Sequence, residues 1–198
     1  MRALKLSLAG LLAILATAAV LQLIAARPSS RISRYVPFAG VVHASQRARV
    51  SPHESTSGTI DGAELTITYG RPSMRGRTIF GRLVAYDRVW CPGADEATTL
   101  DSTRDLRIGD LQVPAGPHTI WMLPTAGEWT LVVSKESSGF HTNYNPSADL
   151  GRVPLTKRAI DTPVEQLTFS IGKNAAGRGG LVTMTWETTE VSVPITVQ

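Results

Sequence analysis

The stretch 89–101, VWCPGADEATTLD, contains more chemically capable side chains than any other part of the chain. It carries Cys91, the only cysteine, and the acidic neighbours Asp95 and Glu96. A nucleophilic cysteine needs a base or a helix N-terminus to lower its pKa, and no helix is predicted nearby. Adjacent residues on an extended chain point in opposite directions, so the two acids are not expected to face one substrate. We therefore expect a loop between strands with a buried, inert Cys91, and we predict no catalytic residue.

Ligand contacts are the next chemistry to consider. Two tryptophans have neighbours that leave their buried face undecided, so they could stack on a sugar ring. The candidate ligand-binding residues are Trp90, Trp121, Glu96, His118 and His141. For Glu96 the structural interpretation is favoured, in which a buried carboxylate is held by Arg71 or Arg77. The four histidines and the single cysteine lack the spacing of a zinc site, so neither a metal nor a cofactor is expected.

Apolar and polar residues alternate along much of the chain, which predicts β-strands. These strands are therefore expected to position the candidate side chains. The clearest alternation covers residues 64–69, 166–171 and 191–197, and further strands are predicted at 98–101, 106–113, 118–123, 129–134 and 152–157. Turns are expected at Gly109-Asp110, before Trp129 and at 187–190. About nine short strands without a long helix predict an all-β fold, an antiparallel β-sandwich of jelly-roll-like or immunoglobulin-like type. The irregular stretch 137–151 is the best candidate for a functional loop.

The first 26 residues form a basic, then apolar segment that indicates export. Two interpretations are open. The apolar run 6–26 is long enough for a transmembrane helix, which needs about 20 residues. A cleavable signal instead ends in small residues, and Ala16-Thr17-Ala18 fits that pattern. The first interpretation places a single-pass anchor with the remaining chain on the periplasmic face of the bacterial cytoplasmic membrane, and the second secretes the chain to the periplasm.

Residues 27–57 are predicted to be a basic, extended linker, followed by the β-sandwich domain at 58–198. Candidate contacts of the linker with a partner or the membrane are Arg27, Arg31, Arg34, Tyr35 and Phe38. Residues 1–58 hold seven of the 20 Lys and Arg residues but one of the 16 acids. The net charge of +4 therefore belongs to the N-terminal segments. A nucleic-acid partner is not expected, because it requires basic residues clustered on a folded face.

Five segments occur in an order typical of one family: TYGRPSMRGRTIFGRLVAYDRVWCPGADEATTL, VPAGPHTIWMLP, GEWTLVVSK, TPVEQLTF and LVTMTWETTEVSVPI. They resemble the domain of unknown function 2911 family of exported bacterial proteins. The positions that match its motifs are Arg71, Pro72, Gly76, Arg77, Gly93, Glu96, Thr98 and Trp129. The chain departs from the pattern at Cys91 and Asp95, where the family commonly has Arg and Asn. Any binding role of those two positions is therefore in doubt.

The function that these features favour is a non-enzymatic accessory subunit. The N-terminal helix would hold it in the membrane, where the domain would brace other subunits of a larger assembly, for example a respiratory or photosynthetic complex. The competing hypothesis is a soluble periplasmic module that binds a saccharide or another small ligand through Trp90, Trp121 and the 137–151 loop. A hydrolase built around Glu96 and His118 or His141 is the least favoured.

Overall fold

Alternating side chains build the strands of this protein, as the sequence predicts. The computed structural model describes residues 50–174 and 177–198, all within the unit Ala48–Gln198. In β2 (Ala63–Gly70), Leu65, Ile67 and Tyr69 are buried, whereas the residues between them are wholly or partly exposed. One face of each such strand therefore contributes to the core.

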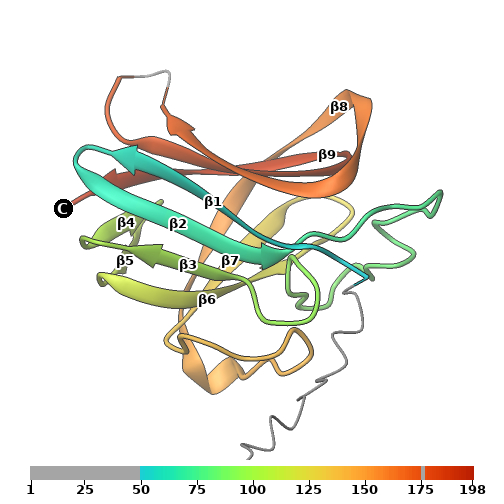
Figure 1. The fold of residues 1–198 in the computed structure, drawn as a ribbon, viewed down its shortest axis with the longest axis horizontal. Helices are drawn as coiled ribbons and strands as arrows, with labels where there is room; N and C mark the ends of the chain where they lie inside the picture. Colours follow the sequence, from blue (N-terminus) through green and yellow to red (C-terminus); the bar gives the residue numbers. More distant parts are fainter. Residues whose placement is uncertain (1–49, 175–176) are drawn as a thin grey trace, which may run out of the picture. The chain divides into compact units, whose positions relative to one another are not determined.

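Nine strands form one antiparallel sheet in the order β1-β2-β3-β6-β7-β8-β9-β4-β5 (Figure 1). The remaining bounds are β1 (His53–Ile60), β3 (Thr99–Ser102), β4 (Leu106–Ile108), β5 (Leu111–Val113), β6 (Gly116–Leu123), β7 (Trp129–Ser134), β8 (Asp149–Lys173) and β9 (Gly180–Val197). One 3-10 turn, η1 (Pro146–Ala148), precedes β8. The all-β, antiparallel character of the chain is thus confirmed.

The two longest strands fold the sheet back over its first edge. The first half of β8 pairs with β7 and with the second half of β9, while its second half pairs with the first half of β9. The register between them shifts between Ala159 and Val164, where the strands bend. A Cβ added at Gly58 of β1 would lie 2.9 Å from the side chain of Ile171 in β8. Figure 1 shows β8 and β9 crossing over β1 and β2.

The main core fills the space inside this curved sheet. Its buried members come from β1 to β9 and include Trp129, Trp186, Leu65, Ile67, Phe169 and Met184. The interior void measures about 20 Å³ and has an almost entirely apolar lining. That volume holds about one water molecule, so the interior is a packed core rather than a ligand chamber.

Three sequence predictions require correction. Strand β1 begins at His53, inside the stretch predicted as linker, because its sequence HESTSGTI is polar at an edge position and shows no apolar alternation. The segments 152–157 and 166–171 belong to one strand, β8. No turn separates two strands at 187–190, since β9 continues through this region and only Glu187 has a positive φ of 55°.

The predicted N-terminal helix at 1–26 and the greater part of the linker lie outside the described residues. Within residues 50–174 and 177–198, no helix has the length and hydropathy needed to cross a membrane.

Candidate functional site

A second, smaller apolar cluster lies on the opposite face of β6 and β7 from the main core. Ile120, Met122 and their β7 partners point into the main core. Trp121 and its cross-strand partner Val132 point the other way. With Cys91 and Ala97 these two residues form what we call the outer cluster. The sequence singles out the stretches 89–101 and 137–151; in the structure the loops 89–98 and 135–148 contribute Val89 and Tyr144, which pack against this cluster.

Cys91 lies at the centre of the outer cluster and is 1% exposed. Its Sγ accepts a hydrogen bond from the backbone N–H of Thr98 at 3.3 Å. The Thr98 hydroxyl donates to the carbonyl oxygen of Pro92 at 3.0 Å, which closes the loop on itself. A Cβ at Gly93 would lie 2.5 Å from that hydroxyl oxygen, so the turn requires glycine. Burial raises the pKa of the Cys91 thiol, and the expectation of a buried cysteine is confirmed.

The raised thiol pKa predicts the reactivity of Cys91. The folded protein retains the thiol proton at pH values where the unfolded chain releases it. The resulting stabilisation is complete below the unfolded thiol pKa and decreases as the pH rises above it. At about pH 8 we expect a thiol reagent to label the native protein very slowly, and to label the chain at one site in guanidinium. Rapid stoichiometric labelling of the native protein would contradict this assignment.

Glu96 does not occupy the environment predicted for it. Its side chain is 45% exposed and lies 3.4 Å from Nδ1 of His53, so the buried carboxylate is wrong. Both expected partners are bonded elsewhere. The Arg77 guanidinium donates to the backbone carbonyls of Ser73 and Met74, and the Arg71 guanidinium is directed towards β1 and β8.

The loop that contains Glu96 is joined to the 135–148 loop by backbone contacts. The N–H of Ala97 donates to the carbonyl of Gly139, and that of His141 donates to the carbonyl of Asp95 at 2.9 Å. Nδ1 of His141 lies 2.7 Å from the same Asp95 oxygen, so this nitrogen carries the proton. Asp95 has a φ of 65°, a conformation that Asn and Asp adopt more readily than most residues.

The other candidate ligand contacts are used inside the protein. Trp90 stacks on Trp186 with ring centroids 6.1 Å apart, and Trp121 is 2% exposed beneath Tyr144. His118 is buried, with its ring nitrogens 2.9 Å and 3.0 Å from the carbonyl oxygens of Ser134 and Pro114. The five candidates are therefore not gathered around one opening. Within the described part of the chain, no three His, Cys, Asp or Glu side chains are grouped to hold a metal ion.

Arg71 fastens the end of β2 to two other strands. Its Nη1 donates to Glu54 of β1 at 3.1 Å, its Nη2 donates to the Thr168 hydroxyl at 2.9 Å, and its Nε donates to the Leu167 carbonyl at 3.1 Å. One guanidinium thus joins β1, β2 and β8. Because the β8 partners lie 96 and 97 residues away along the sequence, spacing alone did not reveal them.

Glu187 is a structural residue that the sequence analysis missed. Its carboxylate accepts hydrogen bonds from the backbone N–H groups of Ile79 at 3.1 Å and Phe80 at 3.3 Å. The adjacent Trp186 donates its Nε1–H to the Glu165 carbonyl at 3.2 Å. Trp186 and Glu187 therefore hold the turn formed by residues 79–81, which we call the Ile-Phe-Gly turn: Glu187 accepts its N–H groups and Trp186 packs against the Phe80 ring. The sequence signal that could have identified Glu187 is its position in the last of the five segments that match the family.

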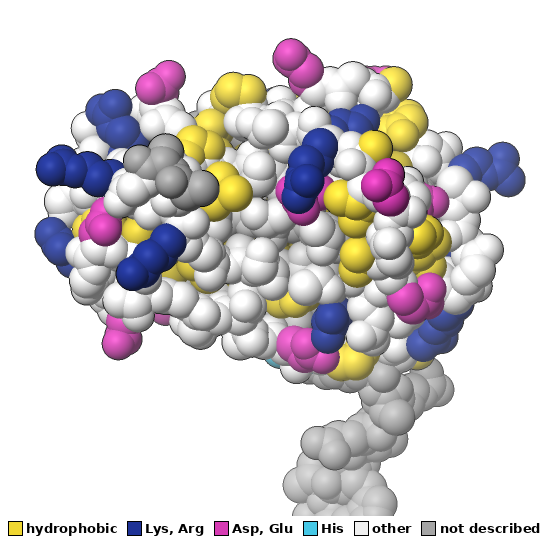
Figure 2. Space-filling view, turned by 90° about the horizontal axis from the view of Figure 1, so that it is seen from above, with side chains coloured by type: hydrophobic (Ala, Val, Ile, Leu, Met, Phe, Trp, Pro, Cys, Tyr) yellow, Lys and Arg dark blue, Asp and Glu magenta, His cyan; other side chains and the backbone are white. Residues whose placement is uncertain are grey.

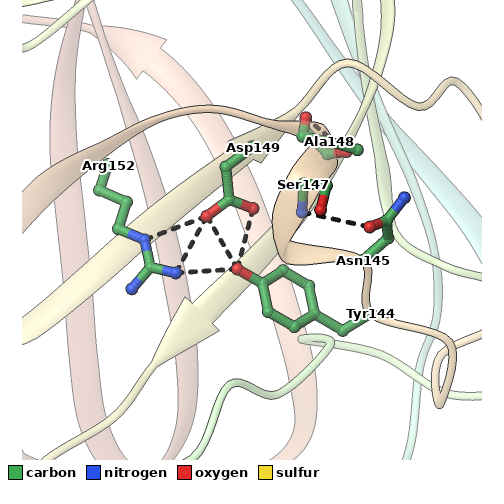
Figure 3. A network of polar contacts seen from close by, with 7 residues as sticks. Tyr144, Asn145, Ser147, Ala148, Asp149 and Arg152 are labelled. Carbon is green, nitrogen blue, oxygen red and sulfur yellow. Dashed lines mark hydrogen bonds and ion pairs between the residues drawn. The ribbon is translucent and has the colours of Figure 1, made fainter.

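The 135–148 loop is closed over the outer cluster by the network in Figure 3. The Tyr144 hydroxyl donates to the Asp149 carboxylate at 2.8 Å and accepts from Nη2 of Arg152 at 2.9 Å. Arg152 also contacts Asp149 directly, at 2.9 Å. Burial, and then the Asp149 carboxylate, raises the pKa of Tyr144. Tyr144 thus packs against the outer cluster, with its ring centroid 5.2 Å from that of Trp121, while most other residues of the stretch predicted as a functional loop are exposed.

Removal of the Tyr144 hydroxyl should loosen this cover. We expect Tyr144→Phe to cost about 1 kcal/mol, because the Asp149–Arg152 pair survives the change. If the lost bond stabilises only the closed loop, labelling of Cys91 should accelerate roughly five-fold. The matched control is Thr142→Ala, since this exposed hydroxyl bonds only to the neighbouring Asn143. Equal labelling rates in the two variants would show that the hydroxyl does not hold the loop.

Together these contacts define a class of protein: an all-β domain in which the distinctive polar side chains bind the loops of the domain to its own sheet. Residues 51–195 match the model of a family described as "Protein of unknown function (DUF2911)". The chain belongs to the DUF2911 family. No curated protein and no solved structure shows significant similarity to the chain.

Proposed function

We propose that this protein is a non-enzymatic accessory subunit, anchored in the cytoplasmic membrane by residues 1–26, whose periplasmic domain braces a larger membrane protein assembly. In this proposal the two halves of the curved sheet act as the two layers of the β-sandwich that the sequence predicts. The observation that supports this proposal most directly is the set of hydrogen bonds that Arg71, Glu187 and Thr98 make within the domain. Glu187 and Thr98 bind the backbone of the protein's own loops, and Arg71 joins β1 to β8, which is what a rigid brace requires.

On the face seen in Figure 2, the charge distribution disfavours a nucleic-acid partner. Lys and Arg side chains are interspersed with Asp and Glu side chains on the face seen in Figure 2, with hydrophobic side chains between them. A nucleic-acid footprint needs a continuous basic patch. Mixed charge with scattered apolar side chains is compatible with a protein contact, because a protein interface as a whole is about as apolar as the rest of the surface.

Fractionation tests this proposal directly. The full chain is produced with a C-terminal tag in a bacterial host, and the membranes are washed with alkaline carbonate. We expect the chain to remain in the washed membranes, with an intact mass that includes residues 1–26, and to co-purify with membrane subunits after mild solubilisation. A soluble, solitary chain shortened to about residue 19 would contradict the proposal. Ligand-dependent tryptophan fluorescence in such a chain would favour the periplasmic binding module instead.

A further inference from the structure

Large exposed apolar side chains in the described residues are concentrated around the start of β1. Val50, Leu83 and Phe140 are 72%, 50% and 46% exposed. With the exposed arginines of the 71–88 loop they form what we call the entry face. We propose that the entry face rests on anionic lipid headgroups of the membrane. This inference deepens the proposed function and depends on its membrane anchor.

Hydrogen-bond and ion-pair contacts place Val50 and Phe140 at one end of the domain, and Leu83 lies in the loop that follows β2 at that end (Figure 1). Nη2 of Arg75 donates to the carbonyl of Val50 at 3.0 Å, which ties the 71–88 loop to the beginning of the domain at Arg75. Phe140 forms a backbone bridge with Glu96. The Glu96 carboxylate in turn lies 3.4 Å from His53, the first residue of β1. Figure 1 shows the loops that follow β2 at the end of the sheet where β1 starts.

The same loop carries more positive than negative charge. Its exposed charged residues are Arg75, Arg77, Arg82, Arg88 and Asp87. Three acids from other strands contact the loop, but each has a partner within it: Glu54 pairs with Arg71, Glu165 accepts from the Arg75 N–H, and Glu187 accepts from the Ile79 and Phe80 N–H groups. Neither Arg82 nor Arg88 forms an ion pair with a residue that the structure describes. Their guanidinium groups are available to phosphate oxygens.

The position of the entry face favours a membrane over a distant partner. The 23 residues 27–49 separate the apolar segment from Val50. A flexible chain of that length spans about 25–30 Å on average. With residues 1–26 in the membrane, as proposed above, a linker of that length would keep the start of the domain within reach of the bilayer. Arginines near an anionic surface are attracted over about one Debye length, roughly 8–10 Å, and exposed Leu and Phe side chains can enter the headgroup region.

An environment-sensitive fluorophore on the full chain in nanodiscs tests this contact. A single thiol label is placed at Leu83→Cys or Phe140→Cys, with Thr59→Cys as a control near the far end of β1. The native Cys91 is buried and does not compete. In nanodiscs of phosphatidylglycerol we expect a blue shift and several-fold weaker iodide quenching at residues 83 and 140, and no change at residue 59. In phosphatidylcholine the shift should be smaller. The nanodiscs contain no native membrane subunit, so such a partner cannot produce the signal, and empty discs of phosphatidylcholine with the same scaffold protein control for contact with the scaffold.

Charge variants identify the arginines responsible. The double variant Arg82→Gln/Arg88→Gln should reverse most of the shift in phosphatidylglycerol. The matched control Arg107→Gln removes an exposed arginine from β4 and should leave the shift intact. If the chain inserts into nanodiscs but residues 83 and 140 are quenched as strongly as residue 59, the lipid contact is overturned while the anchor stands. A chain that does not insert overturns both proposals.

Discussion

Replacement of Trp186 by alanine should lower the free energy of unfolding by about 4 kcal/mol, the usual cost of removing a large aromatic side chain from a core. Trp186 is 1% exposed. It stacks on Trp90 and meets Phe80 edge to face, with centroids 6.1 Å and 6.0 Å away. The change also removes the Nε1–H bond to the carbonyl of Glu165. Chemical denaturation monitored by circular dichroism measures the loss.

The conservative variant Trp186→Phe separates the two contributions. Phenylalanine retains much of the ring contact but lacks the Nε1–H donor, so we expect roughly half of the alanine effect. Should Trp186→Ala instead unfold with nearly the wild-type midpoint, the junction between β9 and the Ile-Phe-Gly turn would not be part of the cooperative core. A variant that fails to fold on expression agrees with the prediction, and Trp186→Phe then supplies the measurable value.

The second large effect is expected for Arg71→Met. This change removes three hydrogen bonds that join β1, β2 and β8. Hydrogen bonds to charged groups contribute about 1.5–3 kcal/mol, but Glu54 is 42% exposed and remains partly solvated. We therefore expect a net loss of about 2 kcal/mol, measured as a lower denaturation midpoint.

Arg77→Met is the matched control for Arg71→Met. Arg77 is an exposed arginine of the same loop, and its guanidinium bonds only to carbonyls three and four residues away. Its replacement should change stability by no more than about 0.5 kcal/mol. A double-mutant cycle of Arg71→Met with Glu54→Gln then isolates the ion pair. Equal losses for the two arginine variants would remove Arg71 from its proposed role as the fastening between strands.

Local sequence was sufficient for most of the strands. The alternation in β2 and at 191–197 of β9 appears directly as buried and exposed positions, because a side-chain period of two depends only on neighbouring residues. The buried Cys91 also followed from local features. The continuity of the long strands did not follow from local features. Strand β8, for example, crosses a polar, proline-containing stretch at 158–166 that carries no alternating signal.

Residue types and short-range periodicity predicted the all-β character, and the order of the five motif segments carried the resemblance to the family that the family-model match confirms. The partners of the motif side chains depended on how the sheet folds back. Arg71 reaches Thr168 across 97 residues, and Glu187 reaches Ile79 across 108. Three other features also depended on how the sheet folds back. They are the edge strand β1, the polar environment of Glu96 and the packing of Trp121 beneath Tyr144. Such pairings are set by packing between segments that are distant in the chain, and no local pattern encodes them.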